Sequence, residues 1–322
     1  MKKAFLLFVI FINLLVCSVV QAKTLQFVQI SDMHLSLIPE NEIKEGELTK
    51  GDYLLKAIKE INENKEIKFV IFSGDSIGKP DKKTMSKFLK IADKLNKPYY
   101  LVIGENEVLR RKNFDKKDFM RMYKLHNLSL ITKGTNYVIK PNKELVFIFV
   151  DGTNETMPTT SGYFKSQTLN WLDKKLSQYK DKKVVLVQHY PIIEPSGKFT
   201  HKTIEPEKYF NTINAHDNVI AIVSGHFHSN NSIYKKGIYH LSAPAFKDEN
   251  REYKIIKIEY NPKYLFANPS EFEITQEIKA MKKQEVEIQE EVEYDIISDV
   301  EYNQSEFIEE PIEENNFLEE VE

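Results

Sequence analysis

Short runs of apolar residues alternate along the chain with stretches in which apolar residues recur every three or four positions. The runs are rich in Val, Ile and Phe and four to six residues long, as buried β-strands are. The stretches have the spacing of amphipathic helices. Strands that alternate with helices indicate an α/β fold with helices on both faces of the sheet. The expected strands are 25–30, 69–72, 99–103, 145–150, 184–187, 219–223 and 238–241, and the expected helices are 51–62, 82–95, 166–179 and 206–213.

The first 22 residues have a different pattern from the rest of the chain. Lys2 and Lys3 precede an apolar stretch over 4–20, and Ala22 ends the segment, which is the pattern of a signal peptide at 1–22. Cleavage would leave an exported protein, periplasmic or extracellular, with no transmembrane domain and without Cys17. An uncleaved N-terminal anchor of marginal length is the alternative, since a spanning helix needs about 20 apolar residues.

Charge divides the remaining chain into two parts. Residues 271–322 contain 19 acidic and 3 basic residues, and 284–322 contain no Lys or Arg. Such a sequence is typical of a disordered acidic tail, which either is simply solvated or docks an unknown partner. Residues 23–270 form the expected folded domain, with 40 basic and 29 acidic residues, and this excess of positive charge favours anionic ligands.

Composition and motifs exclude several classes of protein. With 41% hydrophobic residues the chain has enough apolar side chains for a sizeable core. A single Cys excludes a disulfide scaffold and a CxxC zinc site. The sequence contains no nucleic-acid module and no glycine-rich phosphate loop of the GxxxxGK[ST] or GxGxxG type.

Polar residues that bind metals well follow five of the expected strands. In open α/β sheets, ligands bind at the carboxyl ends of the strands, so these side chains are expected at one rim. Each fragment alone is a weak signal, but five fragments in this order are not a chance pattern. They are Asp32 and His34 after 25–30, Asp75 after 69–72, Glu105, Asn106 and Glu107 after 99–103, His189 after 184–187, and His226 and His228 after 219–223.

With these motifs, the sequence resembles the calcineurin-like metallophosphoesterase family over roughly residues 24–260. The family pattern is D-x-H, G-D, G-N-H-D/E, H and G-H-x-H. The resemblance implies a four-layer α/β/β/α sandwich with two mixed sheets and two divalent metal ions, Mn, Fe, Zn or Co. It also implies a phosphate-ester substrate, a mono- or diester, hydrolysed by a hydroxide that bridges the two ions.

The resemblance also assigns the metal ligands by position. Asp32, His34 and His228 would hold one ion, and Asp75 would bridge both. The second ion would take His189, His226 and the residue at the position of the family's Asn.

The third motif departs from the family pattern, because this chain reads Gly104-Glu105-Asn106-Glu107. An ungapped alignment makes Glu105 a metal ligand and places Asn106 where the family has its catalytic His, with Glu107 beside it. A one-residue shift would make Asn106 the ligand instead. In both alignments the usual general acid is missing, and the remaining histidines are candidate substitutes: His126, His201, His216 and His240.

Two functions are therefore expected. The first is an exported phosphoesterase that is slow or prefers leaving groups that need no protonation. The alternative is a degenerate family member that binds metal and phosphate without efficient turnover.

Overall fold

The computed structural model of the chain describes residues 22–38, 47–128, 130, 132, 134–156, 159–194, 201–262 and 272–281. Apart from Ala22, the predicted signal peptide lies outside these residues, as does the acidic segment 284–322. No helix in these ranges has the length and apolar composition needed to cross a membrane.

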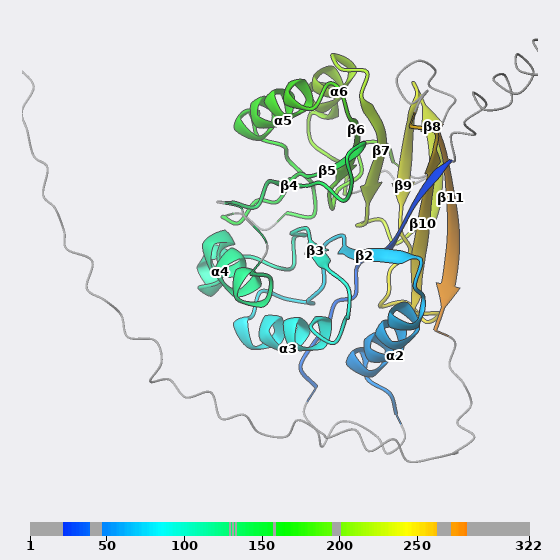
Figure 1. The fold of residues 1–322 in the computed structure, drawn as a ribbon. Coiled ribbons are helices and arrows are strands. Elements are labelled where there is room, and N and C mark those ends of the chain that lie inside the picture. The colour runs from blue at the N-terminus through cyan, green and yellow to red at the C-terminus, as the bar shows by residue number, and fades with distance from the viewer. Residues whose placement is uncertain are drawn as a thin grey trace, which may run out of the picture. The chain divides into compact units, whose positions relative to one another are not determined.

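The described strands form two mixed sheets (Figure 1). The first sheet has the order β11 (Phe272–Ala280), β10 (Glu252–Tyr260), β1 (Lys23–Ile30), β2 (Ile67–Phe72) and β3 (Tyr99–Leu101). The second has the order β4 (Tyr137–Ile139), β5 (Leu145–Phe149), β6 (Lys183–Val187), β7 (Val219–Ser224), β9 (Ile238–Ser242) and β8 (Asn231–Lys235). In the first sheet, β1, β2 and β3 are parallel, and β10 is antiparallel to its neighbours β1 and β11. In the second sheet, β5, β6, β7 and β9 are parallel, and β4 and β8 run antiparallel at the two edges.

Helices cover the outer face of each sheet. Of the described helices, three lie on the first sheet and two lie on the second (Figure 1). A short 3₁₀ helix, η2 (Arg110–Lys112), follows β3. The helices on the first sheet are α2 (Lys50–Glu63), α3 (Lys82–Ala92) and α4 (Lys116–His126), and those on the second are α5 (Ser166–Gln178) and α6 (Pro206–Asn214).

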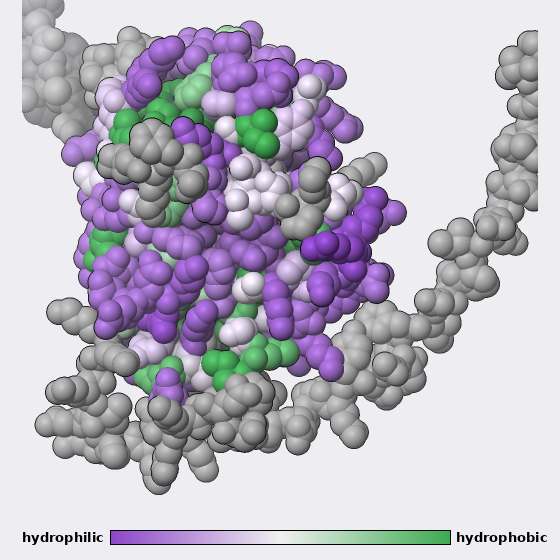
Figure 2. Space-filling model, turned by 180° about the vertical axis from the view of Figure 1, so that it is seen from behind, coloured by the Kyte–Doolittle hydropathy of each residue, from purple (hydrophilic) through white to green (hydrophobic). Residues whose placement is uncertain are grey.

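Three apolar clusters separate the four layers. Along β1, Val28 faces the helices while Phe27 faces the other sheet, as expected for side chains that alternate between the two faces of a strand. Phe27 packs edge-on against Phe147 of the second sheet, with ring centroids 5.2 Å apart. The predicted α/β/β/α architecture with two mixed sheets is confirmed. The surface on the face shown in Figure 2 is mostly hydrophilic, because helices and the other sheet cover the apolar faces of each sheet.

The structure differs from the prediction at the C-terminal boundary. We placed Phe272–Ala280 in the acidic tail, but these residues form β11 and pair with all of β10. Phe272 and Ile274 are buried while Glu273 and Thr275 are exposed, so an alternating strand pattern lies within an acidic sequence. The folded part therefore extends to Met281 rather than to residue 270. The elements β4, β8, β10 and α4 were also missing from the prediction.

One lysine lies in the interior. Lys254 of β10 is 0% exposed, and its ammonium donates to the Ser242 carbonyl at 2.6 Å and to Gln276 Oε1 at 2.7 Å. Burial lowers the pKa of Lys254 to about 7. This charged residue is one reason why the sequence of β10 did not look like a buried strand.

Candidate metal site

The seven candidate ligands come together between the carboxyl ends of the two sheets. β1, β2 and β3 are parallel in one sheet and β6 and β7 in the other, so the loops that follow these strands lie at a common rim. The ligands form three overlapping groups, and within each group the donor atoms lie within 4.8 Å of one another. The groups are Asp32, His34 and His228; Glu105, His189 and His226; and Asp32, Asp75 and His189.

Asp75 lies between the two outer groups. Its Oδ2 is 3.5 Å from His34 Nε2, and its Oδ1 is 3.7 Å from His189 Nε2. Each carboxylate oxygen thus faces a different group of donors, which is the arrangement required of a ligand that bridges two cations.

Backbone carbonyls orient two of the histidines. His189 Nδ1 lies 2.8 Å from the Ser73 carbonyl, and His226 Nε2 lies 3.2 Å from the His201 carbonyl. A carbonyl can only accept, so these nitrogens donate, and the second nitrogen of each ring faces the site, where it can bind a cation once it is deprotonated. Such support by a backbone carbonyl is typical of histidines that bind metals.

The backbone is strained at the site. Five of the seven candidate ligands have positive φ, a conformation that costs a non-glycine residue about 1–3 kcal/mol. Glycines allow the loops to approach closely, since a Cβ at Gly104 would lie 2.1 Å from Asp75 Oδ1. The strained ligands, with φ between 46° and 71°, are Asp32, His34, Asp75, His226 and His228.

The site combines buried carboxyls with few compensating charges. Burial raises the pKa of Asp75 well above its usual value; attraction to His189 opposes this shift, and the Glu105 and Glu107 carboxylates add to it. Burial also opposes ionisation of Asp32, but hydrogen bonding to His228 and the charge of His189 hold its pKa below the usual range. Buried carboxylates this close together require positive charge nearby.

The donors fit divalent cations. Within the described part of the chain, His34 Nε2 is buried and has no hydrogen-bond partner, and the buried Asp32 Oδ1 is 3.3 Å from His228 Nε2; both atoms point into the site. Carboxylate and imidazole donors suit Mn, Fe, Zn or Co. The carboxylates of Asp32, Asp75 and Glu105 would leave one net positive charge on a pair of divalent cations, which still favours binding of a phosphate.

The third motif places Glu105, rather than Asn106, among the donors. The Glu105 carboxylate is 2.9 Å from His189 Nε2 and 3.1 Å from His226 Nδ1. Asn106 turns to the bridging residue, where its backbone N–H donates to Asp75 Oδ1 at 2.9 Å and its side-chain amide donates to Asp75 Oδ2. This geometry corresponds to the ungapped alignment.

Glu107, named from the sequence as a candidate catalytic residue, is fully buried and binds backbone. Its carboxylate accepts N–H groups of Asp75, Ser76 and Ile77 in the loop after β2, and that of Gly104 in the loop after β3. Burial raises the pKa of Glu107 to about 7, although the charge of His189 and the N–H groups of Gly104, Asp75 and Ser76 favour the ionised form. The contacts show a residue that joins two ligand-bearing loops.

Of the four candidate substitutes for the missing acid, His201 alone lies beside the described site. Its ring centroid is 5.8 Å from that of His226. His126 pairs with Asp93 and His216 with Asp173, both at other places in the fold.

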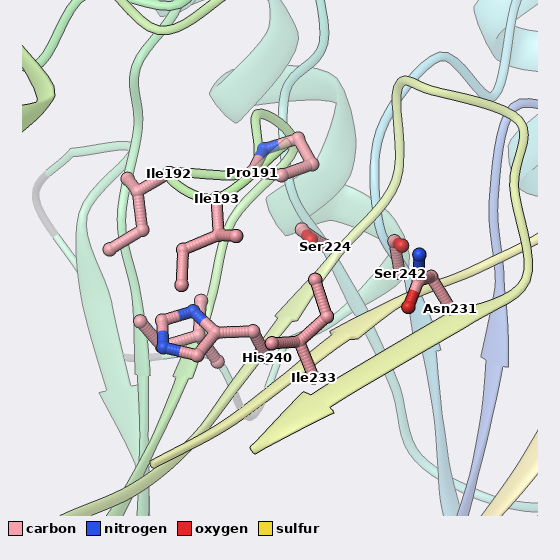
Figure 3. A pocket seen from close by; sticks show the side chains of 9 residues that line it. Pro191, Ile192, Ile193, Ser224, Asn231, Ile233, His240 and Ser242 are labelled. Carbon is pink, nitrogen blue, oxygen red and sulfur yellow. The ribbon is translucent and has the colours of Figure 1, made fainter. Parts of the chain in front are cut away.

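A pocket adjoins the loops that carry His189 and His226 (Figure 3). Ile192 and Ile193 line one side, and Ile233 and His240 line the other. Burial and the nearby Lys235 lower the pKa of His240 to about 4, so the ring is neutral at pH 7. An uncharged lining does not suit a phosphate group.

Sequence reasoning missed the residues that support the ligands. Gln29 of β1 is buried and donates to Ser73 Oγ and to the Ser224 carbonyl, joining the two sheets beneath the site. Ser31 Oγ donates to Asp32 Oδ2. Because Gln29 contacts residues 44 and 195 positions away, the sequence contains no local signal for these contacts.

The fold and the donor set define a class of protein: an α/β/β/α sandwich with a candidate metal site between the strand ends of two sheets. Comparison with known families identifies the family within this class. The chain belongs to the calcineurin-like phosphoesterase family, whose sequence model matches residues 25–230.

Individual proteins agree with this assignment. A probable glycerophosphodiester phosphodiesterase from Arcobacter nitrofigilis is 24% identical over 208 residues, which are 62% of this chain and 71% of that protein. Two solved structures share the fold. One is a dimetal phosphatase from Danio rerio (TM-score 0.55, 14% identity, 72% of this chain and 95% of that one). The other is a putative 5'-nucleotidase from Staphylococcus aureus (TM-score 0.54, 12% identity, 81% and 55%).

Proposed function

We propose that this chain hydrolyses phosphate esters with two divalent cations held by the seven candidate ligands. The observation that carries the proposal is the position of Asp75, whose two oxygens face two separate groups of donors. When bound, such cations neutralise the phosphate and lower the pKa of a coordinated water. Asp32, His34 and His228 would hold one cation, and Glu105, His189 and His226 the other, with Asp75 common to both.

The substrate class that we favour is a phosphodiester. The relative from Arcobacter nitrofigilis carries the name of a probable glycerophosphodiester phosphodiesterase, and family members act on phosphate esters. The excess of basic residues in 23–270 attracts anionic esters by long-range electrostatics.

Asn106 limits the choice of leaving group. An amide that is hydrogen-bonded to Asp75 does not donate a proton to a departing alkoxide as an imidazolium does. A positioned general acid contributes roughly 10²–10⁴-fold to a rate. We therefore propose that esters of acidic alcohols such as p-nitrophenol are hydrolysed much faster than alkyl esters.

Hydrolysis of bis-p-nitrophenyl phosphate and p-nitrophenyl phosphate in Mn²⁺ tests the proposal, together with the metal content of the purified protein. Asp75→Ala should abolish both turnover and binding of the second cation, whereas the exposed Asp181→Ala should keep both. Equal turnover in wild type and Asp75→Ala would refute the proposal. Asn106→His should raise the rate on an alkyl diester, and an unchanged rate would refute the role given to Asn106.

A second function is favoured by the same substitution in the third motif. A chain with Glu105 and Asn106 in place of the family's Asn and His could hold cations and phosphate as a binding protein without turnover. Stoichiometric metal and saturable binding of phosphate, with no hydrolysis of either ester, would distinguish this function.

We also propose export, on the signal-like pattern of residues 1–22. N-terminal sequencing of the protein recovered from the periplasm or medium should begin at Lys23. Recovery in the cytosol with Met1 retained would contradict the proposal.

A further inference from the structure

Three cationic residues from distant parts of the chain cluster at the loop that carries Asp32 and His34. Lys50, the first residue of α2, donates from Nζ to the His34 carbonyl at 2.8 Å. Lys247 follows β9, and its backbone N–H donates to the Asp32 carbonyl at 3.1 Å. These bonds tie both lysines to the loop that carries the ligands of the first group.

Arg251 completes the cluster. Its guanidinium donates to the Lys247 carbonyl and lies 5.1 Å from the centroid of the Tyr53 ring. Its Nε is buried and has no partner within the described residues. The side chain is therefore held in place while part of its hydrogen-bonding capacity is unused.

The positive charge of this cluster is not neutralised by nearby acids. No carboxylate oxygen of the described ranges lies within 4.0 Å of the charged nitrogens of Lys50, Lys247 or Arg251. Burial lowers the pKa of Lys50, and the charges of Arg251 and Lys247 lower it further, as expected for neighbouring cations. Lys247 also contributes, after burial, to the low pKa of His34, so its charge reaches the site.

The two halves of the site differ in charge as a result. The carboxylate of Glu105 lies in one half, while Lys50, Lys247 and Arg251 cluster at the loop that carries Asp32 and His34 of the other. The candidate metal site explains how the esterified phosphate would be bound, but it gives no role to the three cationic side chains. A planar guanidinium and two ammonium groups are the side chains that proteins use to bind carboxylates and phosphates.

We propose that Lys50, Lys247 and Arg251 form a subsite for a second anionic group of the substrate. This inference rests on the proposed function, because the second group is covalently attached to the phosphate ester that the candidate metal site receives. The substrate class is then a phosphate ester that carries a carboxylate or a further phosphate on its non-leaving arm.

Two p-nitrophenyl phosphodiesters with the same leaving group test the subsite. One carries a 2-carboxyethyl arm and the other a propyl arm. Wild type should show a kcat/KM about fivefold higher for the carboxyethyl ester, the effect of roughly one partly exposed ion pair, and this preference should shrink as salt is added. Lys247→Gln should remove most of the preference and Lys247→Arg should keep it, with the exposed Lys174→Gln on α5 as the matched control.

Equilibrium binding separates failure of the subsite from failure of the proposed function. Titration of the metal-loaded protein with 3-phosphonopropionate and with propylphosphonate requires no turnover. Tighter binding of the carboxylate compound that is lost in Lys247→Gln supports the subsite even if neither ester is hydrolysed. Equal binding of the two compounds by wild type, or a preference that Lys247→Gln retains, overturns it while leaving phosphoesterase activity intact.

Discussion

Replacing Glu107 with Gln tests how the two ligand-bearing loops are held together. Oε2 of Glu107 accepts N–H groups of Gly104 and Asp75, and Oε1 accepts those of Ser76 and Ile77. Gln offers one carbonyl oxygen, so two buried N–H groups would face an NH₂ group. An unsatisfied buried donor costs about 1–3 kcal/mol, and the substitution should therefore lower the free energy of unfolding by about 2–6 kcal/mol.

This loss would be a large part of the roughly 5–15 kcal/mol that stabilises a typical domain. Urea denaturation followed by circular dichroism at pH 8 measures it, since the pKa of Glu107 is about 7 and the carboxyl is then mostly ionised. Exposed Glu66→Gln is the control and should change stability by less than about 0.5 kcal/mol. A loss below about 1 kcal/mol for Glu107→Gln would refute the view that this carboxylate joins the loops after β2 and β3.

Three further outcomes are expected. The pKa of Lys254 is about 7 in the fold against 10.5 for the ordinary side chain. The unfolded chain therefore binds more protons between these values, and stability should rise with pH by up to about 1.4 kcal/mol per unit from pH 7 to 10. Denaturation of Lys254→Met across this range should show a flatter dependence. A chain ending at Lys283 should melt like the full chain, whereas one ending at Ser270 lacks β11 and Met281 and should lose about 5–9 kcal/mol from three buried apolar side chains. Gly74→Ala should reduce metal binding, measured by calorimetry, because its Cβ would fall 2.3 Å from His189 Nδ1 at a φ of +99°.

Most of the fold could be read from local patterns. The predicted strands from 25–30 to 238–241 all appear as β1, β2, β3, β5, β6, β7 and β9, and the four predicted helices as α2, α3, α5 and α6, because buried elements of this fold have continuous apolar runs or a clear helical period. The elements that were missed have ambiguous sequences. β10 contains the buried Lys254. In β11 the buried and exposed positions alternate, but the segment is acidic, so its overall composition predicted a tail rather than a strand.

The identities of the candidate ligands were also visible in the sequence, since a strand end is a local feature and Asp and His are recognisable there. Their arrangement was not visible. Whether Glu105 or Asn106 faces His189 depends on the path of one loop. The orientation of the His189 ring depends on a carbonyl 116 residues away, and that of the His226 ring depends on a carbonyl 25 residues away.

The sequence by itself therefore determined the layers, the donor types and the order in which they occur. Only the tertiary structure decided that Glu107 binds backbone, that Asp75 lies between two groups of donors, and that Lys50, Lys247 and Arg251 cluster at the loop that carries ligands of one of them. The physical reason is that apolar periodicity acts over neighbouring residues, whereas hydrogen bonds and charges at a site act between side chains that only chain folding brings within a few ångströms.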